Sequence, residues 1–130
     1  LSLNQLAHTY MQSRNDTYVM ELAIQYIRRN YPKPITLAMV SNEVSLNYAY
    51  FSTMFSKYTG KTFSEYLRNT RMEKAKELLR QPDISIAEVA AQVGYENYKS
   101  FYRAFKDAVG TTPVEYQQKK YRIHREDEKQ

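Results

Sequence analysis

Apolar residues recur along most of the chain at the three- and four-residue spacing typical of helices that bury one face. The first such stripe predicts a helix from Asp16, as its N-cap, to about Asn30. Its apolar positions are Val19, Leu22, Ala23, Tyr26 and Ile27. Pro32 and Pro34 follow the stripe and disfavour a continuation of this helix.

Further segments show the same periodicity, with N-capping residues before them or a glycine after them. The expected helices span about 37–44, 47–58, 63–80, 86–93, 97–109 and 113–121. The inward-facing positions of the longer ones are Phe51, Met54, Phe55, Tyr58, Tyr66, Leu67, Met72, Ala75, Leu78, Leu79, Phe101, Ala104, Phe105 and Ala108. The expected N-caps include Thr36, Thr62, Ser85 and Thr112. Because no segment reads clearly as a strand, the predicted fold is all-α with about seven helices.

The chain contains an internal repeat. Residues 36–44 match residues 85–93 at an offset of 49, and selected positions of 47–66 match those of 97–116 at an offset of 50. Each copy reads as a short helix, a tight turn, a longer helix, a glycine and an N-cap, which is the order of a helix-turn-helix unit. A solenoid of helical hairpins would show similar elements, but two copies are too few for a stable one.

The repeat suggests two helix-turn-helix subdomains within residues 16–121, and their spacing is compatible with binding to DNA. We expect a first motif at 16–62, a linker helix at 63–80 and a second motif at 81–121. A linker helix of about 18 residues is about 27 Å long. It suits two motifs that enter grooves roughly 34 Å apart, and straight DNA would then have to bend towards the protein at a cost of about 1–6 kcal/mol.

Both ends of the chain have a different character. Residues 1–15 are polar with scattered apolar positions, and Leu1 is not a methionine, so we expect a linker from an upstream sensor domain of a longer protein. A response-regulator receiver domain is slightly favoured over a small-molecule-binding barrel as that sensor. Residues 122–130 form a charged tail that we expect to fray.

Composition narrows the function classes. The 130 residues carry a net charge of +5 and no cysteine, which favours a polyanionic partner and excludes disulfide scaffolds, zinc fingers and thiolate catalysis. His8 and His124 are too few and too far apart in sequence to predict a metal site. Because no catalytic triad, glycine-rich phosphate loop, secretion signal or membrane-spanning run is visible, we expect a cytoplasmic protein without enzymatic activity, cofactor, metal or membrane contact.

The second copy carries a specific set of motifs, namely Ile86-Ala87-Glu88-Val89-Ala90, Val93-Gly94-Tyr95, Phe101, Phe105-Lys106, Gly110, Thr112-Pro113 and Tyr116. The first copy has a weaker counterpart in Phe55, Lys57 and Thr59-Gly60. Together these residues make the region from about Thr17 to Tyr121 resemble the DNA-binding domain of AraC/XylS-type transcription regulators. The resemblance implies a monomeric domain that binds specific double-stranded DNA through two helix-turn-helix units. It also implies transcription regulation, usually activation, with RNA polymerase as a further partner.

The resemblance places base-reading positions on both recognition helices. In the second motif these are Tyr98, Lys99, Ser100 and Arg103, with Arg103 suited to a guanine edge. In the first motif they are Ala49, Ser52 and Thr53. None of these three is charged, although family members often carry an arginine or a long amide here, so strong base readout by the first motif is in doubt. The expected phosphate contacts are Tyr48, Lys57, Lys61, Tyr102 and Lys106.

Alternatives stay open at several positions. Asn47 suits an adenine edge, but helix capping is the favoured role for both Asn47 and Asn97. Ser45 stands where the second copy has Gly94, so the first turn is expected to be strained or built differently. The uncharged first recognition helix also leaves room for a protein-interaction module. An alkyl-transferring repair enzyme of the same fold would need a cysteine, which this chain lacks.

Overall fold

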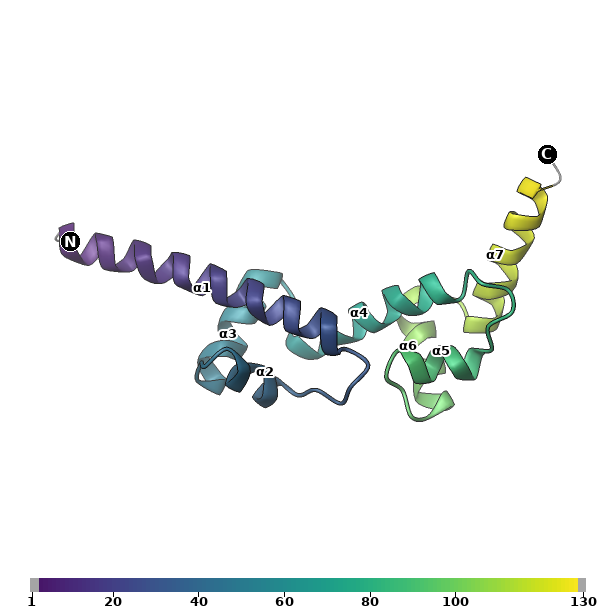
Figure 1. Cartoon of the computed structure of the whole chain (residues 1–130), viewed down its shortest axis with the longest axis horizontal. Coiled ribbons are helices and arrows are strands. Elements are labelled where there is room, and N and C mark those ends of the chain that lie inside the picture. Colours follow the sequence, from purple (N-terminus) through teal and green to yellow (C-terminus); the bar gives the residue numbers. More distant parts are fainter. Residues whose placement is uncertain (1–2, 129–130) are drawn as a thin grey trace. The chain divides into compact units, whose positions relative to one another are not determined.

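The structure is a computed structural model that describes residues 3–128, and the side chains of residues 15–123 and 125–128. Within this part of the chain there are seven helices and no strand, so the predicted all-α class is confirmed. The helices, labelled in Figure 1, are α1 (Leu3–Asn30), α2 (Leu37–Glu43), α3 (Tyr48–Thr59), α4 (Phe63–Leu78), α5 (Ile86–Gln92), α6 (Tyr98–Val109) and α7 (Pro113–Glu128).

The chain divides into two compact units. The first comprises α1 together with Ile35–Tyr66, and in it α2 and α3 pack against each other and against α1. Its buried apolar side chains are Met20, Ala23, Ile24, Ile27, Ile35, Val40, Phe51, Phe55 and Phe63. Phe55 packs edge-on against Phe63 and Tyr66, so the start of α4 completes this core.

The second unit comprises Tyr31–Pro34 and the chain from Leu67 onwards. Its core is a single cluster formed by α4, α5 and α6: Met72, Ala75, Leu79, Val89, Ala90, Val93, Phe101 and Phe105. Tyr116 of α7 packs edge-on against Phe105, just as Tyr66 packs against Phe55 in the first unit. The repeat in the sequence is therefore a repeat of the aromatic core.

Helix α1 begins earlier than predicted. It starts at Leu3, so Asp16 lies within the helix and is not its N-cap. Residues 3–15 contain no glycine or proline, and nothing local stops the helix there. The side chains of Leu3, Leu6, Tyr10 and His8 lie outside the described residues, and so does that of His124.

Helix α7 ends later than predicted. It continues through the charged segment to Glu128 rather than ending near Tyr121. After Pro113 the sequence holds no glycine or proline, and its glutamates, arginines and lysines have good helix propensity. The expected fraying of the charged tail is therefore wrong for residues 122–128.

Three residues predicted to face the core are exposed, and the first of them is Leu22 of α1, at 37%. Tyr58 is 41% exposed, and Ala108, which occupies the same position in the second copy, is exposed as well. Tyr58 and Ala108 each lie three residues after the second buried phenylalanine of their helix, at the edge of the apolar face. In the second unit the next residue, Val109, packs against the core instead.

The predicted N-caps other than Asp16 are confirmed. Side-chain oxygens of Thr36, Asn47, Ser85, Asn97, Thr62 and Thr112 accept hydrogen bonds from backbone N–H groups at the starts of their helices. Ser45 adopts a left-handed φ of +58°, and the matching Gly94 adopts +101°. The first turn therefore places a serine in a conformation that costs a residue with a Cβ about 1–2 kcal/mol.

Candidate DNA interface

Each unit presents one helix whose orientation is set by a pair of buried phenylalanines. In α3 these are Phe51 and Phe55, and in α6 they are Phe101 and Phe105, all fully buried. Because an α-helix turns 100° per residue, the residues two before and two after the first phenylalanine of each pair point away from the core. The outward stripe is therefore decided by the core and not by the polar residues themselves.

In α6 the outward stripe is basic. Lys99 and Arg103 are exposed one turn apart, and Lys106 is exposed near the end of the helix. Asn97 caps the helix by accepting the Lys99 N–H at 2.7 Å, and Gly110 ends it with a φ of +91°. The cap and the buried phenylalanines together hold a short helix rigidly with its cations towards solvent.

In α3 the same positions are uncharged. Ala49 stands in the place of Lys99 and Thr53 in the place of Arg103, and both are exposed. Asn47 caps this helix as well, accepting from the N–H groups of Ala49 and Tyr50 at 3.0 and 3.2 Å. The side-chain oxygen of Asn47 is thus engaged in capping, which was its favoured role.

The predicted contact residues all lie on α3 or α6, except Lys61, which follows the end of α3. Tyr48 and Tyr98, 56% and 45% exposed, open the two helices. Ser100, Lys57 and Lys61 are exposed, whereas Ser52 and Tyr102 are half-buried. The Tyr98 ring lies 6.2 Å from that of Tyr102. The contacts of these residues to DNA stay predictions.

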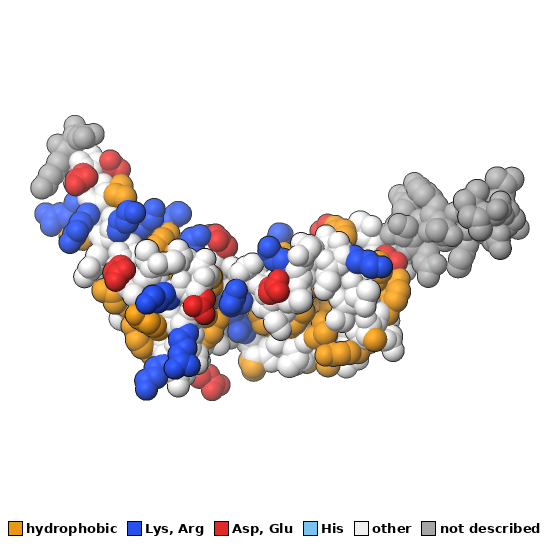
Figure 2. Space-filling model, turned by 180° about the vertical axis from the view of Figure 1, so that it is seen from behind, with side chains coloured by type: hydrophobic (Ala, Val, Ile, Leu, Met, Phe, Trp, Pro, Cys, Tyr) orange, Lys and Arg blue, Asp and Glu red, His pale blue; other side chains and the backbone are white. Residues whose placement is uncertain are grey.

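The charge contrast is visible on the surface. In Figure 2 lysine and arginine side chains gather over the second unit, in the left half of the view, including its lower part. The lower edge of the first unit shows apolar and uncharged polar surface instead. Aspartate and glutamate side chains lie among these cations, but the outward stripe of Lys99, Arg103 and Lys106 on α6 itself carries lysine and arginine only. A stripe of one sign raises the local potential for a polyanion, so α6 attracts DNA more strongly than α3 does.

Two tyrosines tie α3 to α1, and sequence reasoning missed both contacts. The Tyr50 hydroxyl donates to the Asp16 carboxylate at 2.7 Å, and the Tyr58 hydroxyl donates to Glu21. These hydrogen bonds raise the pKa of Tyr50 and of Tyr58 above the usual tyrosine value. The sequence offers only a weak signal for these contacts. The two acidic residues lie five positions apart on one helix, and the two tyrosines lie eight positions apart on another.

Within the second unit, Arg71 binds the segment Tyr31–Pro34, which follows α1 in the chain. Its guanidinium donates to the carbonyl oxygens of Tyr31 at 2.8 Å and Lys33 at 3.0 Å, and it lies 5.6 Å from the ring centre of Tyr95. Burial lowers the pKa of Arg71 and raises that of Tyr95. The backbone partners of Arg71 lie about 40 residues away from it in sequence.

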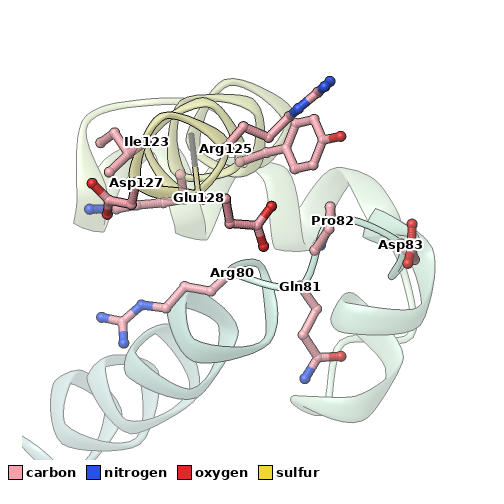
Figure 3. Close-up of a pocket in the computed structure, with 10 residues that line it drawn as sticks. Arg80, Gln81, Pro82, Asp83, Ile123, Arg125, Asp127 and Glu128 are labelled. Carbon is pink, nitrogen blue, oxygen red and sulfur yellow. The ribbon is translucent and has the colours of Figure 1, made fainter. Parts of the chain in front are cut away.

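A pocket of about 980 Å³ lies in the second unit between the α4–α5 connection and α7 (Figure 3). Its charged lining has both signs: Arg80, Lys120, Arg125, Asp83, Asp127 and Glu128. A lining of mixed sign lacks the single-sign potential that attracts a phosphate backbone. The exposed face of α6 therefore remains the better candidate for contact with a polyanion.

Other kinds of site are not visible in the described part of the chain. No group of three or more metal-binding side chains is present there. None of the helices in that part is both long and apolar enough to cross a membrane.

Known proteins share the sequence pattern and the fold of this chain. Residues 40–119 match the family described as "Helix-turn-helix domain". The C-terminal domain of the response regulator AraT from Geobacillus stearothermophilus is 34% identical, with a TM-score of 0.75 over 78% of this chain and 84% of that one. The C-terminal domain of the two-component response regulator yesN from Fusobacterium nucleatum is 38% identical, with a TM-score of 0.71 over 75% of this chain and 95% of that one.

A curated relative is longer than this chain. The xylose operon regulatory protein of Escherichia coli strain K12 is 32% identical over 108 residues, which are 83% of this chain and 27% of that protein. The chain spans between 13% and 36% of the lengths of the first curated relatives that it matches. The family match covers more than half of the chain, including both longer helices with outward faces and the helix between them. The chain therefore belongs to the AraC-type helix-turn-helix domains, the DNA-binding domains of transcription regulators.

Proposed function

We propose that this chain binds specific sequences of double-stranded DNA, with α3 and α6 each entering a major groove. The observation that carries the proposal is the exposed pair Lys99 and Arg103 on α6, held outward by a buried phenylalanine pair that recurs in α3. A helix held in this way fits the major groove, and its outward side chains then meet base edges.

Arg103 is the residue best suited to read a base in the second motif. Its planar guanidinium offers two parallel N–H donors for O6 and N7 of guanine, a pairing worth about 1–3 kcal/mol of discrimination. Lys99 and Lys106 supply positive charge on the same face, and the hydroxyls of Tyr48 and Tyr102 suit phosphate oxygens. Lys57 and Lys61 would provide the phosphate contacts of the first motif.

The two motifs would occupy successive major grooves on one side of the duplex. Such grooves are about 34 Å apart, so the site would hold two blocks of sequence about 10 base pairs apart. Filling both with one protein requires the DNA to bend, which costs about 1–6 kcal/mol and is offset by the second set of contacts.

The whole protein would be a transcription activator of the cytoplasm that acts with RNA polymerase and has no enzymatic activity of its own. Two of its solved relatives are C-terminal domains of response regulators. We therefore propose that residues 1–15 connect this domain to an upstream receiver domain. A small-molecule-binding sensor is the alternative.

Titration with duplex DNA at several salt concentrations tests DNA binding directly. The duplex is one selected from a randomised library, and binding is followed by fluorescence anisotropy. Because neutralised phosphates release counterions, log affinity should fall linearly with log salt concentration. Lys106→Ala should weaken binding to every sequence and make the slope shallower by about one.

Lys74→Ala is the matched control, because Lys74 forms an ion pair with Glu77 on α4. This variant should leave the salt slope unchanged. Affinity that does not depend on salt would contradict DNA binding. It would instead favour the protein-interaction module, for which the uncharged face of α3 is the supporting observation.

A further inference from the structure

The first recognition helix offers methyl groups where the second offers cations. Ala49 and Thr53 are exposed, lie one turn apart on α3, and point away from the buried Phe51 and Phe55. Within Tyr48–Thr59 the single charged residue is Lys57, near the end of the helix. The outward stripe before it therefore consists of the Ala49 methyl group and the methyl and hydroxyl groups of Thr53, with the half-buried Ser52 next to Thr53.

In the major groove these groups match one feature of the bases. Thymine alone among the four bases presents a methyl group there, and alanine and the threonine methyl are the side-chain groups that contact it. Guanine is read best by arginine and adenine by a side-chain amide. The outward stripe carries neither type, and the side-chain oxygen of Asn47 is engaged in capping α3.

From this arrangement we infer that the first motif selects thymines by their C5-methyl groups, through Ala49 and Thr53. This inference rests on the proposed DNA binding and deepens it by assigning a base preference to α3. The selectivity is smaller than that of a guanidinium pair. Burying one methyl group changes an equilibrium constant by about fourfold, so two contacts together contribute roughly tenfold or somewhat more.

The position of α3 also suits close approach to the bases. Short side chains at two successive turns allow the helix backbone to come nearer to the groove floor than lysine or arginine would. The ends of α3 are tied to α1 through Tyr50–Asp16 and Tyr58–Glu21, so the helix is held at both ends while its outward stripe stays exposed. Weak contacts of this kind need such a fixed helix, because they cannot repay the entropy of ordering it.

Deoxyuridine tests the inference, because it differs from thymidine only by the missing methyl group. The 130-residue chain is titrated with its selected duplex and with duplexes in which single thymines are replaced by deoxyuridine. Replacements in the block assigned to α3 should each weaken binding about fourfold. The assignment of the blocks comes from a selection repeated with Arg103→Ala, which should erase the block read by α6 and leave the block read by α3.

A matched pair of variants separates the methyl group from the hydroxyl group. Thr53→Ser removes only the methyl group, whereas Thr53→Val keeps a methyl group and removes the hydroxyl. Thr53→Ser should abolish the effect of deoxyuridine at one thymine, and Thr53→Val should retain it. Thermal unfolding of both variants checks that the fold is intact.

The outcomes distinguish the inference from the function on which it rests. If Arg103→Ala weakens binding but deoxyuridine in the other block has no effect, DNA binding stands and methyl recognition is wrong. A selected block without thymine would overturn methyl recognition in the same way. If Thr53→Val abolishes the deoxyuridine effect, the hydroxyl is the reading group and the inference is also overturned. If the chain selects no sequence and its affinity ignores salt, the proposed function falls, and the inference falls with it.

Discussion

Helices α3 and α6 have nearly the same inner face and very different outer faces. Both are twelve residues long, are capped by asparagine, end at a left-handed glycine and bury two phenylalanines four residues apart. On the outside, however, Ala49 and Thr53 take the places of Lys99 and Arg103. The core thus decides which way each helix faces, and the few residues opposite it are free to differ. Because the buried face orients the helix and the exposed face would contact the bases, the same fold can hold two recognition helices with different exposed side chains.

A similar contrast separates the two turns before these helices. Both turns need a left-handed residue, which is Ser45 in the first unit and Gly94 in the second. A Cβ at Gly94 would lie 2.9 Å from the carbonyl oxygen of Pro32, so the second turn also needs the space that glycine leaves. The first turn accepts a serine and its strain. The second unit is therefore the more constrained of the two as well as the more basic.

The largest effects should come from the shared inner face, and they should be equal in the two units. Phe55→Ala and Phe105→Ala each remove a fully buried ring and should lower the free energy of unfolding by about 3–5 kcal/mol. Chemical denaturation followed by circular dichroism measures both. If one substitution lowers the free energy of unfolding by several kcal/mol less than the other, the two cores do not contribute equally to stability.

The outer faces should respond unequally. Arg103→Ala should weaken binding to the selected duplex by about 1–3 kcal/mol, whereas Thr53→Ser should cost about 0.8 kcal/mol. Arg103→Lys keeps the charge but loses the paired donors, so it should behave like Arg103→Ala towards the preferred sequence. Anisotropy titrations at one salt concentration provide the comparison. Full affinity for Arg103→Lys would show that Arg103 contacts phosphate rather than a base.

The two turns should respond with opposite signs. Gly94→Ala introduces both a close contact and an unfavourable φ, and we expect a loss of about 2 kcal/mol in the free energy of unfolding. Ser45→Gly relieves strain but gives the unfolded chain more freedom, and we expect a net gain of up to about 1 kcal/mol. Thermal unfolding of the two variants measures both effects. Destabilisation by Ser45→Gly would mean that the serine is not strained.

The smallest effect on stability should come from the hydrogen bond between Tyr50 of α3 and Asp16 of α1, which has no counterpart at the matching position of α6, Ser100. Tyr50→Phe removes an exposed hydrogen bond to Asp16 and should change stability only slightly. The bond raises the pKa of Tyr50 above its usual value of 10.0, so it stabilises the fold while the tyrosine is neutral. That contribution should be complete below about pH 10 and disappear as pH rises through the raised pKa. Spectrophotometric titration of tyrosine, compared with Tyr50→Phe and with Asp16→Asn, detects the shift. An unchanged titration in Asp16→Asn would contradict it.

Local rules predict most of this fold because most of its signals are local. The capping residues, the stop glycines and the phenylalanine stripes each act within a few residues, and they locate the helices and the repeat. The same rules place Tyr58 and Ala108 inside, because periodicity alone does not say how wide the buried face of a short helix is. They also begin α1 at Asp16, because a good capping residue within a helix looks like a helix start.

The contacts that sequence reasoning misses are those between residues distant in the chain. Arg71 meets Tyr31 across 40 positions, and Tyr50 meets Asp16 across 34. Neither pair belongs to a repeating pattern, so nothing in the sequence links its members before the fold is known. The exposure of Lys99, Arg103, Ala49 and Thr53 follows from the buried phenylalanines and was predictable. Their contacts with bases are still predictions.

The central claim is that α3 and α6 recognise bases through different side-chain chemistry. The most direct test is a selection from a randomised duplex library, carried out in parallel with the wild-type chain and with Arg103→Ala. We predict two blocks of enriched sequence about 10 base pairs apart, one guanine-containing block that disappears with Arg103→Ala and one weaker, thymine-containing block that remains. Selection of no sequence, or loss of both blocks or of neither with Arg103→Ala, would contradict the claim that α3 and α6 read DNA by different chemistry.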